Sequence, residues 1–542
     1  MGPVRVRPPG ADTIAAVWQR RDRCNKLVGR PRPGNPGDTP AGVHENGSAV
    51  IVHINHISQR KKPRSAERSP QSEMAGLVTG SLMSLVEDGV LDARLAPSLR
   101  IHLDWIQYKT NFRDPVMVRR TANAQGEALP LAEVAIDLRQ ADAATLQNDL
   151  GDAVKGLAQP VDANAKHHLF LGEFNPYRSC EIWAFNLLFW RHLGDWEAAT
   201  GQGFEAALPG GTSDANHPQA VADSVEEFWK LLADLDGHGK LPAEIVGLEI
   251  GVGSGARAAA WLDRFKALDE ACGTTFYSRL HFILGDYSPT TLERAFAAVA
   301  HHGSHASGVP LDALNPYKSL MSYRFKVMYV HLTNVYDNLP FDDLVRRDGK
   351  LYLVEVRAYL NGDKVNQLVA DFGITRADLP GRVETLLAGG PFAVFPGDKG
   401  VAFWRQLWDS FKLEERLRLL DDREEDHVPP GLTRFHLDDL LEEAPDDVRF
   451  HISRGAGESF ANTLPLLHPR GFLQVQDIFV SEMDDYRKGF KGPGKLDGSL
   501  VTWVNGALLR AVGARAGYDV HFAPFPYRPG TKTSILYTTQ RD

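Results

Sequence analysis

Several absences limit what this chain of 542 residues can be. It contains no run of about 18 apolar residues, so the sequence predicts no membrane-spanning helix and no membrane partner. Its cysteines, Cys24, Cys180 and Cys272, lie far apart, and their spacing is typical of neither a disulfide framework nor a zinc knuckle. We therefore expect a reducing, cytoplasmic environment.

Positive charge is scarce outside the N-terminal segment. Residues 1–73 hold 13 Lys or Arg and 6 Asp or Glu, a charge of +7, whereas the whole chain carries −9 and the remainder therefore −16. Nucleic-acid binding needs a cationic surface that meets the phosphates. The acidic body thus argues against DNA or RNA as the main partner.

Residues 1–73 also differ in composition, because they contain 9 Pro and 7 Gly and only one short apolar run, Ala49–Ile54. Such a segment buries too little surface to offset the entropy lost on ordering. We predict that it is disordered, or that it is a mis-assigned extension and the true start is Met74. A targeting peptide is a further alternative, although the prolines would disrupt an amphipathic helix.

The length predicts two or three structural units. We expect a mixed, partly helical N-terminal cap, a first part of a Rossmann-like core, an inserted cap for the substrate, and the last strands of the core. The insertion is expected to contain charged helices such as Trp404–Leu420. The four segments are 74–160, 161–340, 341–450 and 451–542.

In the two core segments, short apolar strands alternate with amphipathic helices, a pattern typical of a parallel sheet. The last two strands, separated by an Arg-Pro-Gly turn, form an antiparallel hairpin, which is the class I methyltransferase variant of the Rossmann-like sheet. The predicted fold class is therefore α/β, with this terminal hairpin, a helical insertion and a disordered N-terminal extension. The expected strands are Ile245–Ile250, Leu280–Leu284, Phe325–Leu332, Phe472–Phe479, Tyr518–Phe525 and Thr533–Thr538.

A glycine-rich turn follows the first of these strands. Gly251, Gly253 and Gly255 alternate there, as expected where the backbone approaches a ligand closely or adopts positive φ. A dinucleotide site would have the spacing G-x-G-x-x-G and face a pyrophosphate. Here the spacing is G-x-G-x-G and Glu249 precedes it, which suits the cationic amine and sulfonium of S-adenosylmethionine. We assign all four residues to binding of this cofactor, with a structural turn as the alternative.

Two further strand ends provide candidate contacts. Asp286 ends the next strand, where a carboxylate can accept hydrogen bonds from both ribose hydroxyls, and Tyr287 can pack on the adenine. Asn334 and Asp337 follow the strand Phe325–Leu332, at the edge where the ligand crevice lies in such sheets. They are candidates for contacting the methionine moiety or the methyl acceptor. The alternative for Asp286 is an acid that caps the next helix, and the alternative for Asn334 and Asp337 is a polar turn.

The segment Thr333–Pro340 resembles the Asn-Glu-x-x-Asp-Ala-x-Pro motif of the MidA-like methyltransferases, a family that includes assembly factors of respiratory complex I. Three other segments are similar to family motifs: Gly172–Ile182, Phe472–Asp477 and Asp497–Asn505. The resemblance implies S-adenosylmethionine as cofactor and an arginine side chain of a partner protein as acceptor. Glu181 in the first segment and Asp337 would then be catalytic and orient or deprotonate the acceptor.

The chain also departs from the family pattern. Asn334 occupies the position of the family's glutamate, and Val252 replaces the proline of its glycine turn. A guanidinium needs carboxylates around it. With the acid at position 334 missing, Glu181, Asp337 and Asp477 would have to take its place.

Other reactive side chains are interpreted as structural. His301, His302 and His305 follow a helix without acidic or cysteine neighbours, so we predict a loop and no metal site. Cys180 has no histidine nearby, which favours a buried cysteine over a nucleophile.

The sequence thus indicates an enzyme, an S-adenosylmethionine-dependent methyltransferase whose acceptor is a protein or a small molecule. A small-molecule O- or N-methyltransferase and a non-catalytic assembly or scaffold protein of the same fold are the rival interpretations. An NAD-dependent oxidoreductase is disfavoured by the glycine spacing and the terminal hairpin. The sequence leaves the acceptor and the oligomeric state open.

Deletion of residues 1–73 should leave the melting temperature and the affinity for S-adenosylmethionine nearly unchanged, because the segment has little apolar surface to bury. Differential scanning fluorimetry and calorimetry on the truncated chain check this expectation. A fall of several degrees in melting temperature would mean that the segment packs on the body.

Overall fold

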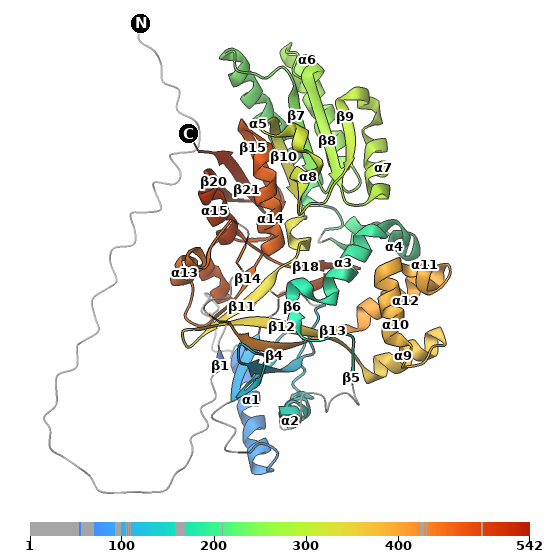
Figure 1. Ribbon diagram of the computed structural model, residues 1–542, viewed down its shortest axis with the longest axis vertical. Coiled ribbons are helices and arrows are strands. Elements are labelled where there is room, and N and C mark those ends of the chain that lie inside the picture. Colours follow the sequence, from blue (N-terminus) through green and yellow to red (C-terminus); the bar gives the residue numbers. More distant parts are fainter. Residues whose placement is uncertain are drawn as a thin grey trace, which may run out of the picture. The chain divides into compact units, whose positions relative to one another are not determined.

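The computed structural model describes residues 54–55, 70–92, 99–104, 106, 108, 110–157, 168–208, 210–421, 428–429, 431–488 and 492–541 (Figure 1). The extension 1–73, for which disorder is predicted, lies outside these residues except at two places. Ile54 and Asn55 form a short strand that pairs with Ile101 and His102, and residues 70–73 begin a helix that continues to Glu87, so the prediction of disorder is wrong there. None of the described helices is long and apolar enough to cross a membrane. The described chain contains two large sheets and two short ribbons.

The first large sheet has seven strands in the order β20-β21-β15-β10-β7-β8-β9. Its strands run parallel except for β21, which is antiparallel to both β15 and β20. This order, with a reversed last strand, is the class I methyltransferase arrangement, so the predicted fold class and terminal hairpin are confirmed. The strands are β7 (Ile245–Ile250), β8 (Leu280–Asp286), β9 (Ala306–Pro310), β10 (Val327–Thr333), β15 (Leu467–Asp477), β20 (Tyr518–Pro524) and β21 (Ser534–Gln540).

Helices cover both faces of this sheet, because alternate residues of its buried strands point to opposite sides. One apolar cluster joins the sheet to α5, α6 and α7 and contains Phe228 and Trp261. A second cluster, with Phe460 and Leu509, joins the other face to α8, α14 and α15. These helices are α5 (Pro218–Gly237), α6 (Ala256–Cys272), α7 (Pro289–Ala298), α8 (Pro316–Ser319), α14 (Arg454–Thr463) and α15 (Gly506–Arg515).

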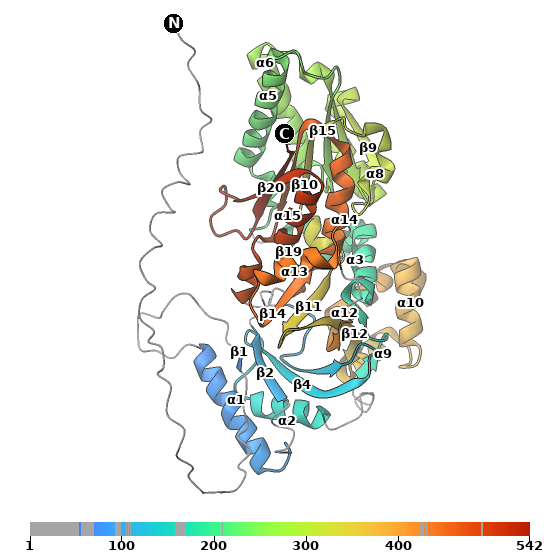
Figure 2. The same cartoon turned by 60° about the vertical axis from the view of Figure 1, so that its left-hand side comes forward.

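The second large sheet combines strands from the N-terminal cap and from the insertion (Figure 2). Its order is β1-β2-β4-β3-β13-β12-β11-β14, and β5 and β6 also pair with β12. The parallel pair of β3 and β13 joins the two segments. The strands are β1 (Ile54–Asn55), β2 (Leu99–Asp104), β3 (Val116–Ala122), β4 (Ala128–Asp137), β5 (His168–Phe170), β6 (Asn175–Pro176), β11 (Asp342–Arg347), β12 (Lys350–Asn361), β13 (Phe411–Leu419) and β14 (Val448–Ile452).

The insertion contains helices, as expected, but also the strands β11, β12, β13 and β14. The helix predicted over Trp404–Leu420 is wrong in its second half, because α12 ends at Ser410 and β13 begins at Phe411. From Phe411 onward, apolar and charged residues alternate with the period of a strand.

The other α-helices in the described part of the chain are α1 (Pro70–Glu87), α2 (Leu146–Leu157), α3 (Glu181–Arg191), α4 (Leu193–Thr200), α9 (Gly362–Phe372), α10 (Leu379–Gly389), α11 (Pro391–Val394), α12 (Asp398–Ser410) and α13 (Arg434–Glu442).

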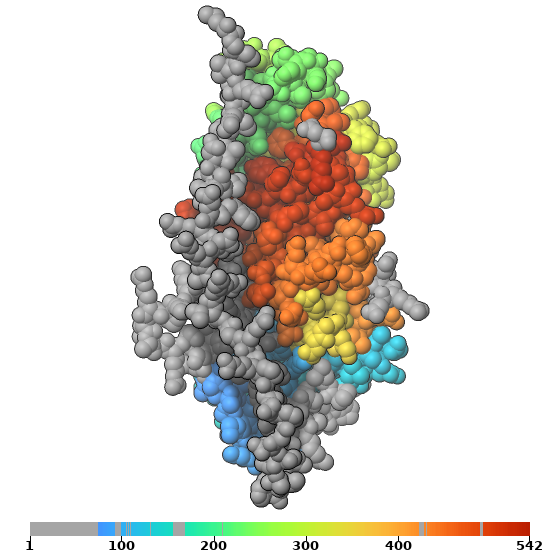
Figure 3. Space-filling model, turned by 90° about the vertical axis from the view of Figure 1, so that its left-hand side faces the viewer, coloured from blue at the N-terminus to red at the C-terminus, as the bar shows by residue number. Residues whose placement is uncertain are grey.

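The insertion packs directly on the core. Leu437 and Leu441 of α13 and Phe450 of β14 share one apolar cluster with Ala507 and Leu508 of α15. On the face shown in Figure 3, the orange part of the insertion adjoins the red C-terminal segments of the core. The region that we interpreted as a cap is therefore continuous with the core.

Replacing Gly255 by Ala should lower the free energy of unfolding by about 3 kcal/mol, because positive φ costs roughly 1 kcal/mol and overpacking adds roughly 2. Gly255 has φ +78°, and an added Cβ would lie 2.6 Å from the Cα of Ala295 in α7. Gly517→Ala is the matched control, since Gly517 has φ +82° and open space around the same position. Urea denaturation measures both, and equal losses would contradict the steric explanation.

Candidate functional site

The glycine turn joins β7 to α6 at the carboxyl edge of the first sheet. Gly251, Gly253 and Gly255 all have positive φ, at +73°, +56° and +78°. A Cβ on Gly251 would lie 2.5 Å from Val335, but a Cβ on Gly253 would meet no atom within 4 Å. Gly251 and Gly255 therefore allow close packing, whereas Gly253 borders open space that a ligand can occupy.

Asp286, at the end of β8, contacts this turn. Its Oδ2 accepts a hydrogen bond from the backbone N–H of Gly253 at 3.3 Å, and its Oδ1 accepts one from Ser288 at 2.9 Å. Burial raises the pKa of Asp286, and these backbone donors oppose that shift. Ser288 also caps α7, which begins with Pro289. The turn and the acid, 33 residues apart, are thus brought together as the sequence argument requires.

Glu249 occupies a different environment from the one that its predicted role requires. Its side chain is buried, and its carboxylate accepts a 2.8 Å hydrogen bond from Arg257 of α6. Arg257 also donates to the hydroxyl of Tyr329 at 2.6 Å. Burial raises the pKa of Glu249 and Arg257 opposes the rise. The charge of Glu249 is therefore balanced by a cation of its own chain.

Tyr287 and Asn334 lie on neighbouring loops at the same edge. The ring of Tyr287 is 40% exposed, and its hydroxyl accepts a hydrogen bond from Arg191 of α3 at 3.1 Å. Asn334 has φ +52°, a conformation that asparagine tolerates better than most residues, and its N–H donates to the carbonyl of Gln476 at 3.0 Å. Its side chain is thus placed by a backbone turn that ties β10 to β15.

Asp337 and Asp477 form a buried carboxylate pair. Asp477 Oδ2 accepts hydrogen bonds from the N–H groups of Tyr336 at 2.9 Å and Asp337 at 3.2 Å, and Oδ1 accepts one from Ile478 at 2.7 Å. Among the described residues, neither carboxylate has an ion-pair partner. Burial and then the charge of Asp477 raise the pKa of Asp337 well above its usual value. Burial also raises the pKa of Asp477, to about 7, although its backbone donors oppose the rise. Because these donors favour the ionised form of Asp477, we assign the shared proton to Asp337.

Tyr108 is a site residue that the sequence argument missed. Its hydroxyl is buried and has no hydrogen-bond partner in the described part of the chain. Burial raises its pKa well above the usual value, and the charges of Asp337 and Asp477 add to the rise, so the hydroxyl lies near the pair. Its ring lies where a side chain on Gly494 would be. No local motif marks Tyr108, because its neighbours come from distant parts of the sequence.

Glu181 opens α3 and lies against the Gly172 backbone, where an added Cβ would overlap its carboxylate. The thiol of Cys180 donates to this carboxylate at 3.3 Å, and burial raises the pKa of that thiol. The beginning and the end of the family-like segment Gly172–Ile182 are therefore in contact. Asn186, on the same helix, donates to the carbonyl of Asn338 at 3.0 Å, which fixes α3 beside the Asp337 turn.

A chain of buried polar groups connects this turn to the second sheet. Arg449 donates to Asp343 at 2.6 Å, and Asp343 in turn contacts His451. His451 lies 3.4 Å from the hydroxyl of Thr502, whose N–H donates to the carbonyl of Asp337 at 3.1 Å. Burial would raise the pKa of Asp343, but His451 and Arg449 lower it. Here each charge has an opposite partner, in contrast to the Asp337–Asp477 pair.

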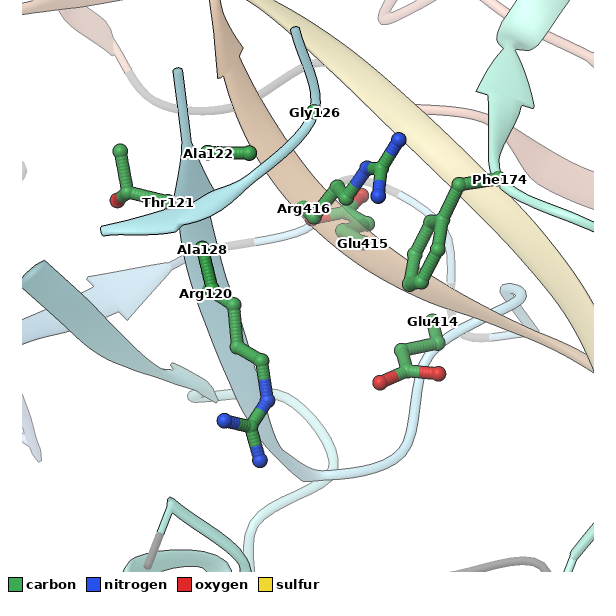
Figure 4. A pocket seen from close by; sticks show the side chains of 9 residues that line it. All are labelled: Arg120, Thr121, Ala122, Gly126, Ala128, Phe174, Glu414, Glu415 and Arg416. Carbon is green, nitrogen blue, oxygen red and sulfur yellow. The ribbon is translucent and has the colours of Figure 1, made fainter. Parts of the chain in front are cut away.

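A hollow in the second sheet is separate from the glycine turn. Figure 4 shows Phe174, Glu414 and Arg416 around it, with the guanidinium of Arg416 over the Phe174 ring at 4.5 Å. Arg416 also donates to Glu355 at 2.6 Å, and Arg357 donates to Glu414 at 2.8 Å. These charges serve to pair the side chains of β12 and β13. We therefore assign no cofactor to the hollow.

The sequence suggested that the histidine segment has no acidic neighbours, but the structure places an acid beside it. Asp263 of α6 lies against His301 and His302, while His305 contacts the carbonyl of Leu280 at 3.1 Å. The sequence argument considered only neighbours along the chain, and Asp263 is 38 residues before His301.

Comparison with known proteins found no matching family model and no match among curated proteins. A presumed methyltransferase from Burkholderia thailandensis bound to S-adenosyl-homocysteine is 12% identical, with a TM-score of 0.41, over 70% of this chain and 89% of that one. An uncharacterised protein of the same superfamily and organism is 12% identical, with a TM-score of 0.39 and the same coverage. Mitomycin 7-O-methyltransferase is 13% identical, with a TM-score of 0.25, over 65% of this chain and 68% of that one. At such TM-scores the fold assignment rests on the strand order alone.

Gly253→Ala and Asp286→Ala should each weaken binding of S-adenosylmethionine at least tenfold without unfolding the protein, since the first strains and fills the ligand side of the turn and the second removes the acid beside it. Titration calorimetry measures the affinities. Gly239→Ala, at φ +63° with open space around it, and exposed Asp312→Ala are the matched controls. Unchanged affinity in both site variants would contradict the assignment.

Proposed function

We propose that this protein is an S-adenosylmethionine-dependent methyltransferase. The observation that carries the proposal is the hydrogen bond between Asp286 and Gly253, which unites the ends of β7 and β8. In open α/β sheets the ligand crevice lies at the carboxyl ends of the strands, where the strand order reverses. Here that point is at β7, between β10 and β8.

The residues around this crevice fit the chemistry of the cofactor. Gly253 permits close approach to its backbone, and Asp286 would accept hydrogen bonds from the ribose hydroxyls. Tyr287 would cover the adenine, and Asn334 would contact the methionine moiety. Glu249, paired with Arg257, would hold the turn in place and act on the cofactor only through it.

Bound S-adenosylmethionine would supply an electrophilic methyl group. The contribution of the chain is to place the acceptor in line with that methyl group and to take its proton. Asp337 is suited to the second task, because burial and the charge of Asp477 beside it raise its pKa well above the usual value. Tyr108 would orient the acceptor through its hydroxyl, which has no hydrogen-bond partner among the described residues.

We further propose that the acceptor is an arginine side chain of a partner protein, as the MidA-like resemblance implies, and that it enters beneath the insertion 341–450. Two buried carboxylates without a cation of their own suit a planar cation. Glu181 would provide a third acid, on the helix that contacts the Asp337 turn. The charge of −16 on residues 74–542 would attract a basic segment.

One observation favours a second candidate, a small-molecule O- or N-methyl acceptor. Asn334 stands where the resembling family has an acid, so one charged partner of a guanidinium is missing. A neutral acceptor would need only Asp337 as proton acceptor. A non-catalytic assembly protein with the same fold is the third possibility that the experiment below distinguishes.

The acceptor class can be tested with S-adenosylmethionine that carries a labelled methyl group. The full-length protein is incubated with lysate of the source organism, and protein and small-molecule fractions are separated. We expect label on arginine in the protein fraction. Label only in small molecules would replace the protein-arginine proposal by the second candidate, and label in neither would favour the assembly protein.

In this assay, Asp337→Asn should lower the rate of label transfer by about 100-fold, a usual contribution of a positioned proton acceptor. The wild-type rate should rise with pH through the raised pKa of Asp337, because the carboxyl accepts a proton only after losing its own, and the variant should lack this rise. Affinity for S-adenosylmethionine should stay unchanged. Exposed Asp312→Asn is the control, and a wild-type rate in Asp337→Asn would contradict the assignment.

A further inference from the structure

Three potential metal ligands meet on the outer side of the first sheet, away from the glycine turn. Asp263 lies in α6, and His301 and His302 lie in the short helix η8 (Ala300–His305) that directly follows α7 (Figure 1). One carboxylate oxygen and one nitrogen from each ring lie within 4.8 Å of one another. Two secondary-structure elements thus contribute to one compact group.

Two of the three distances within this group are close to the edge of a tetrahedral zinc site. Ligand atoms at 2.0–2.1 Å from zinc lie about 3.3 Å from each other in a tetrahedron. Here Asp263 Oδ1 is 2.9 Å from His301 Nε2 and 3.4 Å from His302 Nε2. The third distance, between the two imidazole nitrogens, is at most 4.8 Å.

His302 provides an independent indication that this group binds a ligand. Its side chain is 2% exposed, yet its Nε2 has no hydrogen-bond partner among the described residues and points towards the exposed carboxylate of Asp263. Its Nδ1 lies 2.8 Å from the hydroxyl of Tyr277. If Nδ1 carries the proton and donates to Tyr277, Nε2 presents a lone pair, which is the usual arrangement behind a metal-bound histidine. A buried imidazole nitrogen without a hydrogen bond is costly unless something binds it.

We propose that Asp263, His301 and His302 form a binding site for a divalent transition-metal ion, with zinc as the best match. Two imidazoles and one carboxylate are ligands of zinc and its neighbours, whereas magnesium and calcium prefer oxygen alone. Water would complete the tetrahedron on the exposed side.

The ion would join two helices that both begin at the candidate cofactor site. The helix α6 starts directly after Gly255, and α7 starts three residues after Asp286. Gly255 already packs against Ala295 of α7. A metal bridge between Asp263 and the segment after α7 would fix the same pair of helices further along their length. The expected role is therefore to stabilise the fold around the cofactor site.

The test uses the full-length protein, freed of metal with a chelator and titrated with zinc chloride in a calorimeter. We expect one zinc ion per chain, and a dissociation constant at least tenfold larger in Asp263→Asn, His301→Asn and His302→Asn. Cobalt(II) should give the visible absorption of a tetrahedral site in the wild type only. The first two residues are exposed, so their variants keep the test valid if His302→Asn fails to fold.

His238→Asn is the matched control, because His238 faces Asp234 at 3.6 Å as a single exposed pair. This variant should bind zinc like the wild type, and zinc should raise the melting temperature of both but not of the three site variants. Absence of stoichiometric zinc binding by the wild type would overturn the proposal, as would equal binding by the site variants. None of these measurements depends on methyl transfer.

Discussion

The candidate site depends on one steric constraint, the close approach of three backbone segments at the end of β7. A Cβ on Gly251 would lie 2.5 Å from Val335 after β10, and one on Gly255 would lie 2.6 Å from the Cα of Ala295 in α7. Because glycine leaves this space free, both segments reach the turn that begins α6. The same convergence brings Asp286 within hydrogen-bond distance of that turn and leaves the ligand side of Gly253 open.

Buried carboxylates around this turn are stabilised in two different ways. Glu249 is neutralised by Arg257, and Asp343 by Arg449 and His451, as burial of a charge normally requires. Asp477 instead accepts backbone hydrogen bonds, and Asp337 beside it has a raised pKa. Carboxylates with a cationic partner hold structural elements together. A carboxylate pair that has no ion-pair partner among the described residues is costly to bury and is therefore typical of a functional site.

The second sheet explains how distant segments contribute to one site. The cap before residue 160 and the insertion after 340 share this sheet through β3 and β13, so neither is a separate lid. The charges of Asp337 and Asp477 raise the pKa of Tyr108 in the cap, and α3 contacts the Asp337 turn through Asn186. In the proposed enzyme, the core would hold the cofactor while the other segments shape the acceptor side.

The sequence by itself determined the first sheet and its glycine turn, because buried strands, helix starts and positive-φ glycines are local patterns that tertiary contacts rarely change. It missed the edge strand β9 (Ala306–Pro310), whose alternate residues are exposed, and the strand half of 404–420, where helix and strand signals overlap. Only the tertiary structure decided which side chains face each other. It turned Glu249 towards Arg257, brought Tyr108 to the carboxylate pair and placed Asp263 against two histidines. These pairings join residues far apart in the chain, and no local periodicity encodes them.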